Sequence, residues 1–347
     1  MPKNKITIQQ IADLAGVNKA TVSRVLNGNT NISEKTRQKI ESIMKEHDYV
    51  PNTNARGLAF NKTFTIGFCF DYTDKKAFAN PFFYKVMSGI EDAVYGNDYL
   101  FLMMSDHNKG KGKSTFERVV AEHRVDGVLI PDTLLTPDNY RLLMHHGMPF
   151  VVIGETMLPE VGIHWVDVDN SLAGQLLTET LIAQGYRNIS LYADAESLKR
   201  DKFIADRIQG YRRAMDAHGM SPRIFADAGS FRKAVRSDGS SAERLAGRAD
   251  ALICCTNDQL FDVLDPDNGG PLAADIGLAT FDDLSMHRYL KRNVHYVVID
   301  LEQMGHKAAE LLFSLVNKAA NIPDLIRIPT TKVIESNAKR TEHDDNL

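Results

Sequence analysis

Short apolar segments alternate with amphipathic segments through most of this 347-residue chain. The apolar segments are typical of buried strands, whereas the amphipathic segments repeat apolar residues at helical spacing. Strands that alternate with helices pair in parallel, and helices then cover both faces of the sheet, so we expect an α/β body of two doubly wound lobes. The predicted strands are residues 65–70, 99–104, 127–131, 150–154, 165–169, 189–193, 251–256 and 276–281. The predicted helices are residues 81–95, 114–122, 138–146, 171–184 and 204–218.

The composition excludes several classes of protein. The chain has 43% hydrophobic and 25% charged residues, and its apolar runs are far shorter than the roughly 20 residues that cross a bilayer. Its three cysteines, two of them adjacent, give neither a disulfide framework nor a CxxC metal motif. The N-terminus has no apolar secretory core. We therefore expect a cytoplasmic protein with no membrane partner.

Charge is distributed unevenly along the chain. Residues 1–62 hold seven Lys and three Arg against five acidic residues, so this segment carries a net charge of +5. The whole chain carries −4, so residues 63–347 carry −9. A basic segment on an acidic body is typical of a module that binds a polyanion, although chance variation in surface charge is the plainer interpretation.

The basic segment has the pattern of a helix-turn-helix. Thr7 and Gln10 have the spacing of a capping box ahead of a predicted helix at residues 8–15, which Gly16 ends. Asn18 and Ser33 are suited to cap a second and a third helix. In such a fold the second helix enters the major groove of DNA. The alternative is a small helical bundle that contacts proteins.

Several motifs then resemble one family. Residues 7–17 read TIQQIADLAGV and residues 20–28 read ATVSRVLNG, which closely resembles the head of the lactose-repressor (LacI/GalR) family, and residues 49–58 are similar to its hinge. Further motifs in the family's order occur at residues 80–83, 89–91, 125–127, 168–170, 207–211, 257–258 and 281–283. The chain is identified as a member of this family on these motifs.

The resemblance implies a domain organisation. A DNA-binding head is expected at residues 1–50, a hinge helix and linker at 51–63, an effector-binding and dimerisation body at 64–337, and a flexible tail at 338–347. The body would resemble a periplasmic sugar-binding protein whose chain crosses between the lobes three times. We expect lobe 1 at about residues 64–163 plus 299–321, and lobe 2 at about residues 164–296 plus 322–337.

The resemblance also assigns residues to DNA. Lys19, Ala20 and Arg24 occupy the base-reading positions, and Arg24 is the candidate for a bidentate contact with guanine. Other polar residues of the head would anchor the sugar-phosphate backbone, although the hydroxyl of Ser23 could simply be solvated. The expected DNA-binding residues are Thr7, Lys19, Ala20, Thr21, Ser23, Arg24, Asn27, Asn52, Ala55 and Leu58.

Leu58 matches the family's apolar wedge, which enters the minor groove and kinks the duplex. Alternatively, Leu58 packs the head against the body. The hinge helix contains Gly57, where many relatives have Ser, and is too short to be stable alone. It would therefore form when two copies meet on DNA, so the resemblance implies a homodimer on a pseudo-palindromic operator.

A small-molecule effector is expected between the lobes, because open parallel sheets bind ligands at the carboxyl ends of their strands. Carboxylate, amide and guanidinium groups suit the hydroxyls of a sugar, and aromatic rings suit its apolar face. The candidate effector-binding residues are Asp71, Phe82, Phe83, Trp165, Arg207, Asn257, Asp282 and Asp300.

Most of these candidates have a structural alternative. Arg207 could form a surface salt bridge, Asn257 and Asp282 could cap helices, and the aromatic residues could pack in the core. Two features depart from the family. The segment between Asn257 and Phe281 is shorter than in most relatives, and Asp300 stands near the position where relatives often have Gln. The effector of a relative therefore does not transfer to this chain.

Catalysis is not expected, because GxGxxG, GxxxxGK[ST], GxSxG and HExxH motifs are all missing from the sequence. No cofactor or metal is expected either, because adjacent histidines such as His145 and His146 point apart on a helix. The sequence predicts a repressor of carbohydrate genes with a sugar-like effector, and the effector could be an inducer or a corepressor. The alternatives are a regulator controlled by a phosphoprotein and a free solute-binding protein.

Overall fold

The structure is a computed structural model of the whole chain, and its placement of most residues can be described. The described residues are 6–26, 31–49, 57, 60–73, 81–107, 112–227, 229–231, 249–265, 272, 275–282, 290, 292–330 and 332–335. The chain divides into two compact units, Met1–Phe64 and Thr65–Leu347, and each is described by itself.

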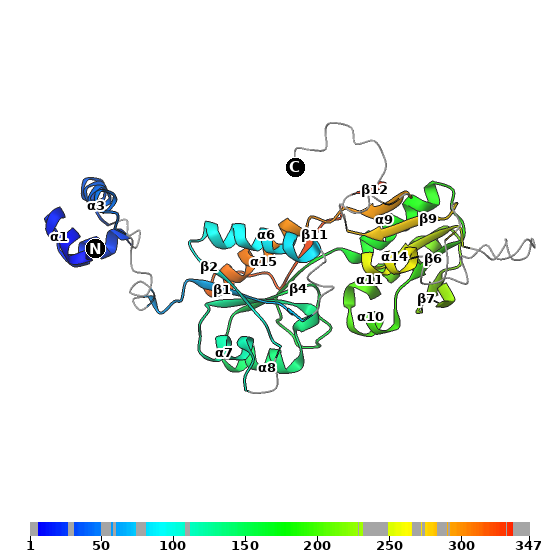
Figure 1. Cartoon of the computed structure of the whole chain (residues 1–347), viewed down its shortest axis with the longest axis horizontal. Helices are drawn as coiled ribbons and strands as arrows, with labels where there is room; N and C mark the ends of the chain where they lie inside the picture. The colour runs from blue at the N-terminus through cyan, green and yellow to red at the C-terminus, as the bar shows by residue number, and fades with distance from the viewer. Residues whose placement is uncertain are drawn as a thin grey trace, which may run out of the picture. The chain divides into compact units, whose positions relative to one another are not determined.

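The first unit is a small helical head (Figure 1). It contains α1 (Ile8–Ala15), α2 (Lys19–Leu26) and α3 (Glu34–Glu46). The caps are those that the sequence predicts: Thr7 and Gln10 form a capping box, Oδ1 of Asn18 accepts from the backbone of Thr21 at 2.7 Å, and Ser33 caps α3. One face of each helix supplies the buried core, which contains Ile11, Ala12, Ala15, Val22, Val25 and Ile40.

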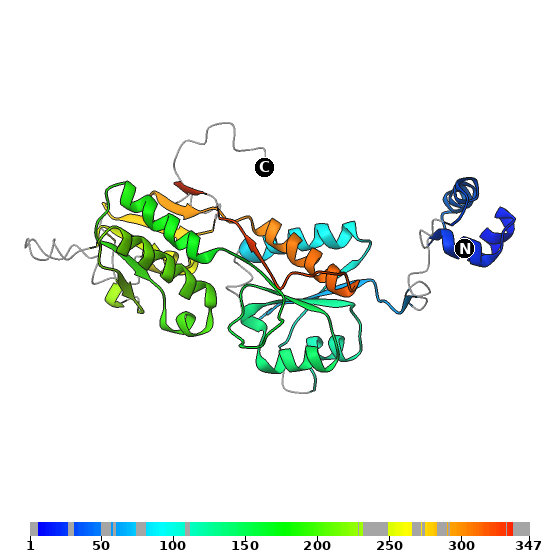
Figure 2. The same cartoon turned by 180° about the vertical axis from the view of Figure 1, so that it is seen from behind.

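The second unit contains two six-stranded sheets, one in each lobe. The first sheet has the order β11-β5-β4-β3-β1-β2 and is parallel throughout. Its strands are β1 (Thr65–Cys69), β2 (Leu100–Met104), β3 (Gly127–Pro131), β4 (Phe150–Ile153), β5 (Trp165–Val168) and β11 (Leu325–Ile328). In both Figure 1 and Figure 2, α6 (Pro81–Gly96) and α15 (Leu301–Val316) lie on one face of this sheet, and α7 (Thr115–Ala121) and α8 (Pro137–His145) lie on the other.

The second sheet has the order β12-β10-β9-β8-β6-β7, and only the β10–β12 pair is antiparallel among the described strands. Its strands are β6 (Ile189–Tyr192), β7 (Arg223–Phe225), β8 (Ala251–Cys254), β9 (Gly277–Phe281), β10 (Val294–Val297) and β12 (Val333–Glu335). Its helices are α9 (Asn170–Ala183), α10 (Ala195–Arg200), α11 (Lys202–Ala217) and α14 (Asn257–Leu264). The chain therefore has the predicted α/β body with a helical head.

The limits of the lobes differ from those predicted. The chain passes between the sheets after β5, after β10 and after β11, which makes three crossings. β5 and β11 both belong to the first sheet, although we expected residues 165–168 and 325–328 in the second lobe. Local periodicity identifies a buried strand, but it does not reveal which neighbour that strand pairs with.

Each lobe contains a pair of helices that approach closely through glycines. In the second lobe, a Cβ atom on Gly210 of α11 would lie 1.9 Å from the carbonyl oxygen of Ser171 in α9. In the first lobe, a Cβ atom on Gly89 of α6 would lie 1.9 Å from the carbonyl oxygen of Glu302 in α15. Backbone packs against backbone at both contacts, so neither position has room for a side chain.

We expect Gly210→Ala to lower the free energy of unfolding by about 1–3 kcal/mol, because α9 and α11 must separate to admit the methyl group. Urea denaturation of the full chain measures this loss. Gly96→Ala is the matched control, because a Cβ atom there meets nothing within 4 Å. Equal stability of the two variants would contradict the packing interpretation.

Among the described residues, no helix is both long enough and apolar enough to span a membrane.

Candidate functional site

The outer surface of α2 is the first candidate site. Val22 and Val25 are buried against α1 and α3, so the helix can present only its other face. Lys19, Ala20 and Arg24 are all exposed on that face. The structure thus places the three residues predicted to read bases together on an accessible helix surface.

The other predicted DNA contacts have mixed placements. Thr7 is exposed, and its side chain also caps α1, with its Oγ1 accepting from the backbone of Gln10 at 3.3 Å. Thr21 and Ser23 are half-buried at the edges of the α2 surface. Asn27, Asn52, Ala55 and Leu58 lie outside the described residues.

The second candidate site is a cleft of about 700 Å³ that is lined by both lobes. This volume is within the range that small-molecule sites occupy. Polar residues enter the cleft just after the carboxyl ends of strands: Asp132 follows β3, Asn170 follows β5, and Asp194 follows β6. The cleft therefore has the position that open parallel sheets give to a ligand site.

Arg207 of α11 lies in the wall of the cleft, with only 5% of its surface exposed. Its Nε donates to Oδ1 of Asn170 at 2.9 Å, and its Nη1 donates to the carbonyl oxygen of Cys255 at 2.6 Å. The guanidinium carbon lies 4.1 Å from the ring centroid of Phe281. Burial lowers the pKa of Arg207, and the nearby carboxylate of Asp282 opposes that effect. These contacts fix the guanidinium in one orientation, and the third nitrogen can donate to a ligand.

Asn257 and Asp282 form the wall beside Arg207. The amide nitrogen of Asn257 donates to the carbonyl oxygen of Phe281 at 2.8 Å, which fastens α14 to the end of β9. Asp282 follows that strand with a φ of 67°, a conformation that Asp and Asn adopt more readily than most residues. Burial raises the pKa of Asp282, and Arg207 and Lys85 counteract the rise.

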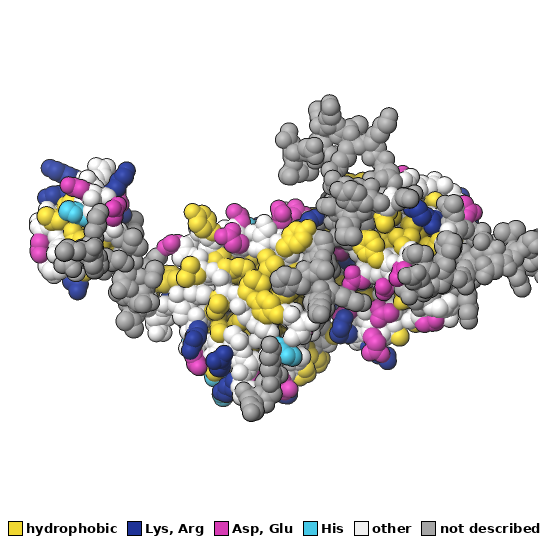
Figure 3. All heavy atoms as spheres, in the orientation of Figure 1, with side chains coloured by type: hydrophobic (Ala, Val, Ile, Leu, Met, Phe, Trp, Pro, Cys, Tyr) yellow, Lys and Arg dark blue, Asp and Glu magenta, His cyan; other side chains and the backbone are white. Residues whose placement is uncertain are grey.

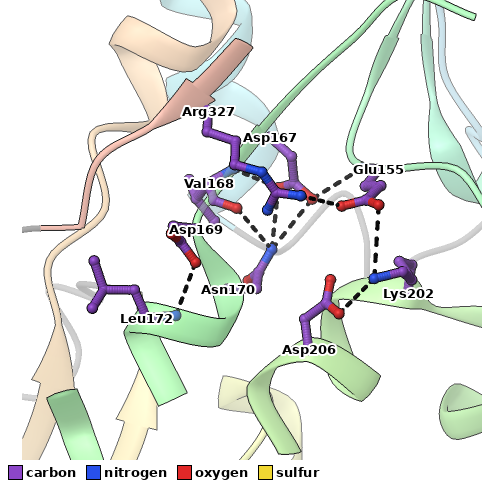
Figure 4. Close-up of polar contacts among 9 residues, drawn as sticks. All are labelled: Glu155, Asp167, Val168, Asp169, Asn170, Leu172, Lys202, Asp206 and Arg327. Carbon is purple, nitrogen blue, oxygen red and sulfur yellow. Dashed lines mark hydrogen bonds and ion pairs between the residues drawn. The ribbon is translucent and has the colours of Figure 1, made fainter. Parts of the chain in front are cut away.

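Asp167 and Asn170 support the floor of the cleft at the crossing after β5 (Figure 4). The carboxylate of Asp167 accepts from the backbone amides of Glu155 and Val168 at 3.0 and 2.6 Å, and from the side chain of Asn170. Asn170 in turn accepts from Arg207. This chain of hydrogen bonds connects the crossing strand of the first sheet to α11 of the second lobe.

An ion-pair network lies beside this floor and joins the two lobes. Nζ of Lys202 in α11 lies 3.7 Å from the carboxylate of Glu155, which follows β4, and 2.5 Å from that of Asp206 (Figure 4). Arg327 of β11 also pairs with Glu155, at 2.9 Å. Glu155 therefore connects the two lobes at the edge of the cleft.

Family models match both units of the chain. Residues 7–52 match the family of bacterial regulatory proteins of the lacI family, and residues 64–231 match the periplasmic binding proteins and sugar binding domain of the LacI family. Residues 178–336 also match the periplasmic binding protein-like domain. The chain belongs to the LacI family. The predicted family and fold are therefore confirmed.

Curated relatives of this LacI-family chain span nearly its whole length. It is 29% identical to the HTH-type transcriptional regulator CelR of Thermobifida fusca, over 92% of this chain and 95% of that protein. It is also 29% identical to the HTH-type transcriptional regulator GalR of Escherichia coli K12, over 96% of each.

Solved structures show the same fold. A CelR–cellobiose complex superposes with a TM-score of 0.64 at 26% identity, covering 96% of this chain and all of that one. A lac repressor dimer bound to operator and an anti-inducer superposes with a TM-score of 0.66 at 20% identity, covering 96% of this chain and 99% of that one.

Six of the eight residues predicted for the effector site line the cleft of this LacI-family chain: Asp71, Phe82, Phe83, Arg207, Asn257 and Asp282. Trp165 and Asp300 are not among the lining residues, and this corrects their predicted position. Trp165 packs on the cluster of the first lobe and under the guanidinium of Arg327, 5.1 Å from its ring centroid. Asp300 caps α15 by accepting from the backbone of Gln303 at 2.8 Å.

Sequence reasoning missed several lining residues of the LacI-family cleft. Asp132 and Asp194 directly follow strands that the sequence predicts. Their position after a strand is the same signal that identifies Asp71. Gln259 and Asp201 carry no such signal, because helices position them after the chain has turned away from a strand. Their place in the cleft depends on tertiary structure.

Asp132 makes the stability of the unliganded protein depend on pH. Burial, followed by the nearby carboxylates of Asp167 and Asp201, raises the pKa of Asp132 from 3.8 to about 8. The folded state therefore holds this proton more tightly than the unfolded state. The resulting stabilisation is fully present below pH 3.8, declines as the pH rises from 3.8, and is lost above about 8.

We expect Asp132→Asn to stabilise the protein by about 1–3 kcal/mol more at pH 9 than at pH 5, because Asn stays neutral and residual water screens part of the shift. Urea denaturation at both pH values measures this difference. Asp216→Asn, on the exposed surface of α11, is the control. If the free energies of unfolding of Asp132→Asn and the parent protein differ by the same amount at both pH values, the proposed effect of Asp132 on stability is wrong.

Proposed function

We propose that this chain is a sequence-specific transcriptional regulator that represses carbohydrate genes and whose operator affinity a sugar-like effector controls. The observation that carries this proposal is the surface of α2, where Lys19, Ala20 and Arg24 are exposed together on a capped helix-turn-helix. An Arg side chain on such a helix can form two hydrogen bonds with O6 and N7 of guanine. Lys19 supplies a contact to a base or a phosphate, and Ala20 an apolar contact.

Two copies of the head are required on one operator. A single head reads too few base pairs to distinguish one site in a genome, so a homodimer on a pseudo-palindromic operator follows. The fold supports this assembly, because the lac repressor dimer bound to operator covers nearly the whole of this chain. Residues 51–63 would form the hinge, with Asn52, Ala55 and Leu58 at the minor groove.

The cleft would hold the effector. Its carboxylates, amides and one guanidinium suit hydroxyl groups, and Phe82 and Phe83 suit the apolar face of a sugar ring. The CelR–cellobiose structure shows a relative of the same fold with a sugar. We propose no cofactor and no catalytic step, and we place the protein in the cytoplasm, where its operator is.

Control of the operator would follow from linkage between the two sites. An effector that binds one arrangement of the lobes more tightly changes the affinity of the protein for DNA. DNA changes the affinity of the protein for the effector by the same factor. The bridge from Lys202 to Glu155 joins the two lobes, so a change in their arrangement would alter it. Inducers and corepressors use the same linkage with opposite sign.

The experiment is selection of genomic fragments by the full-length protein in the presence of bulk competitor DNA, followed by sequencing. We expect enrichment of fragments that share one inverted repeat. We also expect a sugar to change the amount of this DNA that the protein retains. Mono- and disaccharides are screened by thermal shift, because a ligand that binds the folded state raises its midpoint. If no fragment is preferred with or without sugars, the proposed function is wrong.

A further inference from the structure

The cleft is strongly acidic. Its described lining includes nine Asp or Glu side chains and two Arg side chains, and because Asp132 keeps its proton below its raised pKa of about 8, the formal charge at neutral pH is −6. In Figure 3, Asp and Glu side chains gather on the part of the second lobe that is nearest the first lobe. Low-dielectric walls of one charge concentrate the field inside a cleft, so this site attracts cations and repels anions.

The guanidinium and amide nitrogens of the cleft are mostly engaged within the protein. Nε and Nη2 of Arg200 donate to the carboxylate of Asp201 at 2.8 and 3.0 Å. Arg207 gives two of its three nitrogens to Asn170 and Cys255. The amide nitrogen of Asn170 faces Asp167. Few nitrogen donors of the cleft are therefore left for a ligand.

Acceptors, in contrast, remain open. Gln259 of α14 is only 5% exposed, and its Nε2 donates to the carboxylate of Asp194 at 2.8 Å. Because that carboxylate can only accept, the orientation of the amide is fixed and Oε1 points elsewhere. Oε1 of Gln259 and Oδ1 of Asp282 are both buried, and neither has a hydrogen-bond donor among the described residues. A buried acceptor without a donor is costly unless a ligand supplies one.

We propose that the effector of this cleft is a polyol with a protonated amino group, the chemistry of an amino sugar, and that the cleft rejects sugar phosphates and sugar acids. This inference rests on the proposed effector-binding function and names the class of effector. An ammonium group has three donors and no acceptor, so it suits open acceptors in an acidic cleft. A phosphate or carboxylate brings acceptors and negative charge, and both are unfavourable there.

The carboxyl groups of Asp132, Asp167 and Asp201 support the same class of ligand. They approach one another from the two lobes, and their mutual repulsion contributes to the raised pKa of Asp132. A cation bound in the cleft would compensate this repulsion and favour the ionised form of Asp132, whereas a neutral sugar would not. The amino group therefore adds an interaction that a hydroxyl at the same position lacks.

The test is calorimetric titration of the full-length protein at pH 6.5 with matched hexoses of the gluco, galacto and manno series. Each series contains the parent sugar, its 2-amino-2-deoxy form, the N-acetylated amine, the 6-phosphate and the uronic acid. We expect one amino form to bind about tenfold more tightly than its parent, because a hydrogen bond between charged groups is about twice as strong as a neutral one. The acetylated amine should lose this gain, and the two anions should not bind.

Asp282→Asn tests the role of the open carboxylate, since Asn also adopts a positive φ without strain. Asp282→Asn should reduce the preference for the amino form over the parent sugar at least threefold, because the ammonium group loses one charged hydrogen-bond partner. Asp169→Asn is the control, because Asp169 lies next to the cleft floor but caps α9, and Asn caps equally well (Figure 4). It should leave the preference unchanged.

Three results would overturn the proposal: a parent sugar that binds as tightly as its amino form, a phosphate or uronic acid that binds, or no heat with any amino sugar. Selection of genomic fragments separates these failures from a failure of the proposed function. A protein that retains a shared inverted repeat and responds to a neutral sugar is still the proposed regulator, and only its class of effector is then wrong.

Discussion

Arg24→Ala is expected to abolish the preference of the protein for its operator while weak binding to any DNA remains. Arg24 is exposed on α2, and a bidentate contact with guanine provides about 1–3 kcal/mol of discrimination. A dimer loses the contact in both half-sites, so the expected loss is about 2–6 kcal/mol. Gel-shift titrations with the selected fragment and with a scrambled fragment measure the ratio of the two affinities.

Lys39→Ala is the matched control, because it also removes one positive charge from an exposed position in the head, but from α3. It should weaken binding to both fragments similarly and keep their ratio, as expected for charges that act on the phosphate backbone. If Arg24→Ala behaves like Lys39→Ala, Arg24 contacts the phosphate backbone and does not read a base.

Arg207→Met is expected to weaken effector binding by about 10- to 150-fold and to leave operator binding without effector intact, because a hydrogen bond from a charged donor contributes about 1.5–3 kcal/mol. The substitution keeps the aliphatic stem but removes the contacts with Asn170 and Cys255. These acceptors then lack their donor, so the free energy of unfolding should also fall. Calorimetry with the effector and gel shifts with the operator give the two affinities.

Arg213→Met is the control, since Arg213 is exposed on the same helix and does not line the cleft. Its effector affinity should equal that of the parent protein. A variant at residue 207 that folds and retains normal effector affinity would show that the guanidinium only supports the walls of the cleft.

The elements of this fold could be predicted because their signals are local. Thr7, Asn18 and Ser33 mark the starts of the three head helices, and all three side chains cap as the sequence indicates. The central strands β3, β4 and β8 are apolar over their whole length, as expected for strands buried on both faces. The pairing of β5 and β11 could not be predicted, because it depends on contacts between segments about 160 residues apart.

The cleft could be predicted in part for the same reason. Asp71 and Asp282 follow strands, and the carboxyl ends of parallel strands meet at one edge of a sheet. Trp165 begins a strand, so it lies at the opposite edge, while Asp300 stands just before a helix and serves as its cap. The side chains brought in by helices, such as Gln259, depend on how each helix is rotated against its sheet.

The close contact between α9 and α11 also controls the position of Arg207. A Cβ atom on Gly174 of α9 would lie 2.2 Å from the carbonyl oxygen of Arg207, although Gly174 is not among the cleft residues. The spacing of two helix backbones thus sets where the guanidinium is presented. Effector sensitivity can therefore be tuned from inside the protein, by residues that never touch the small molecule.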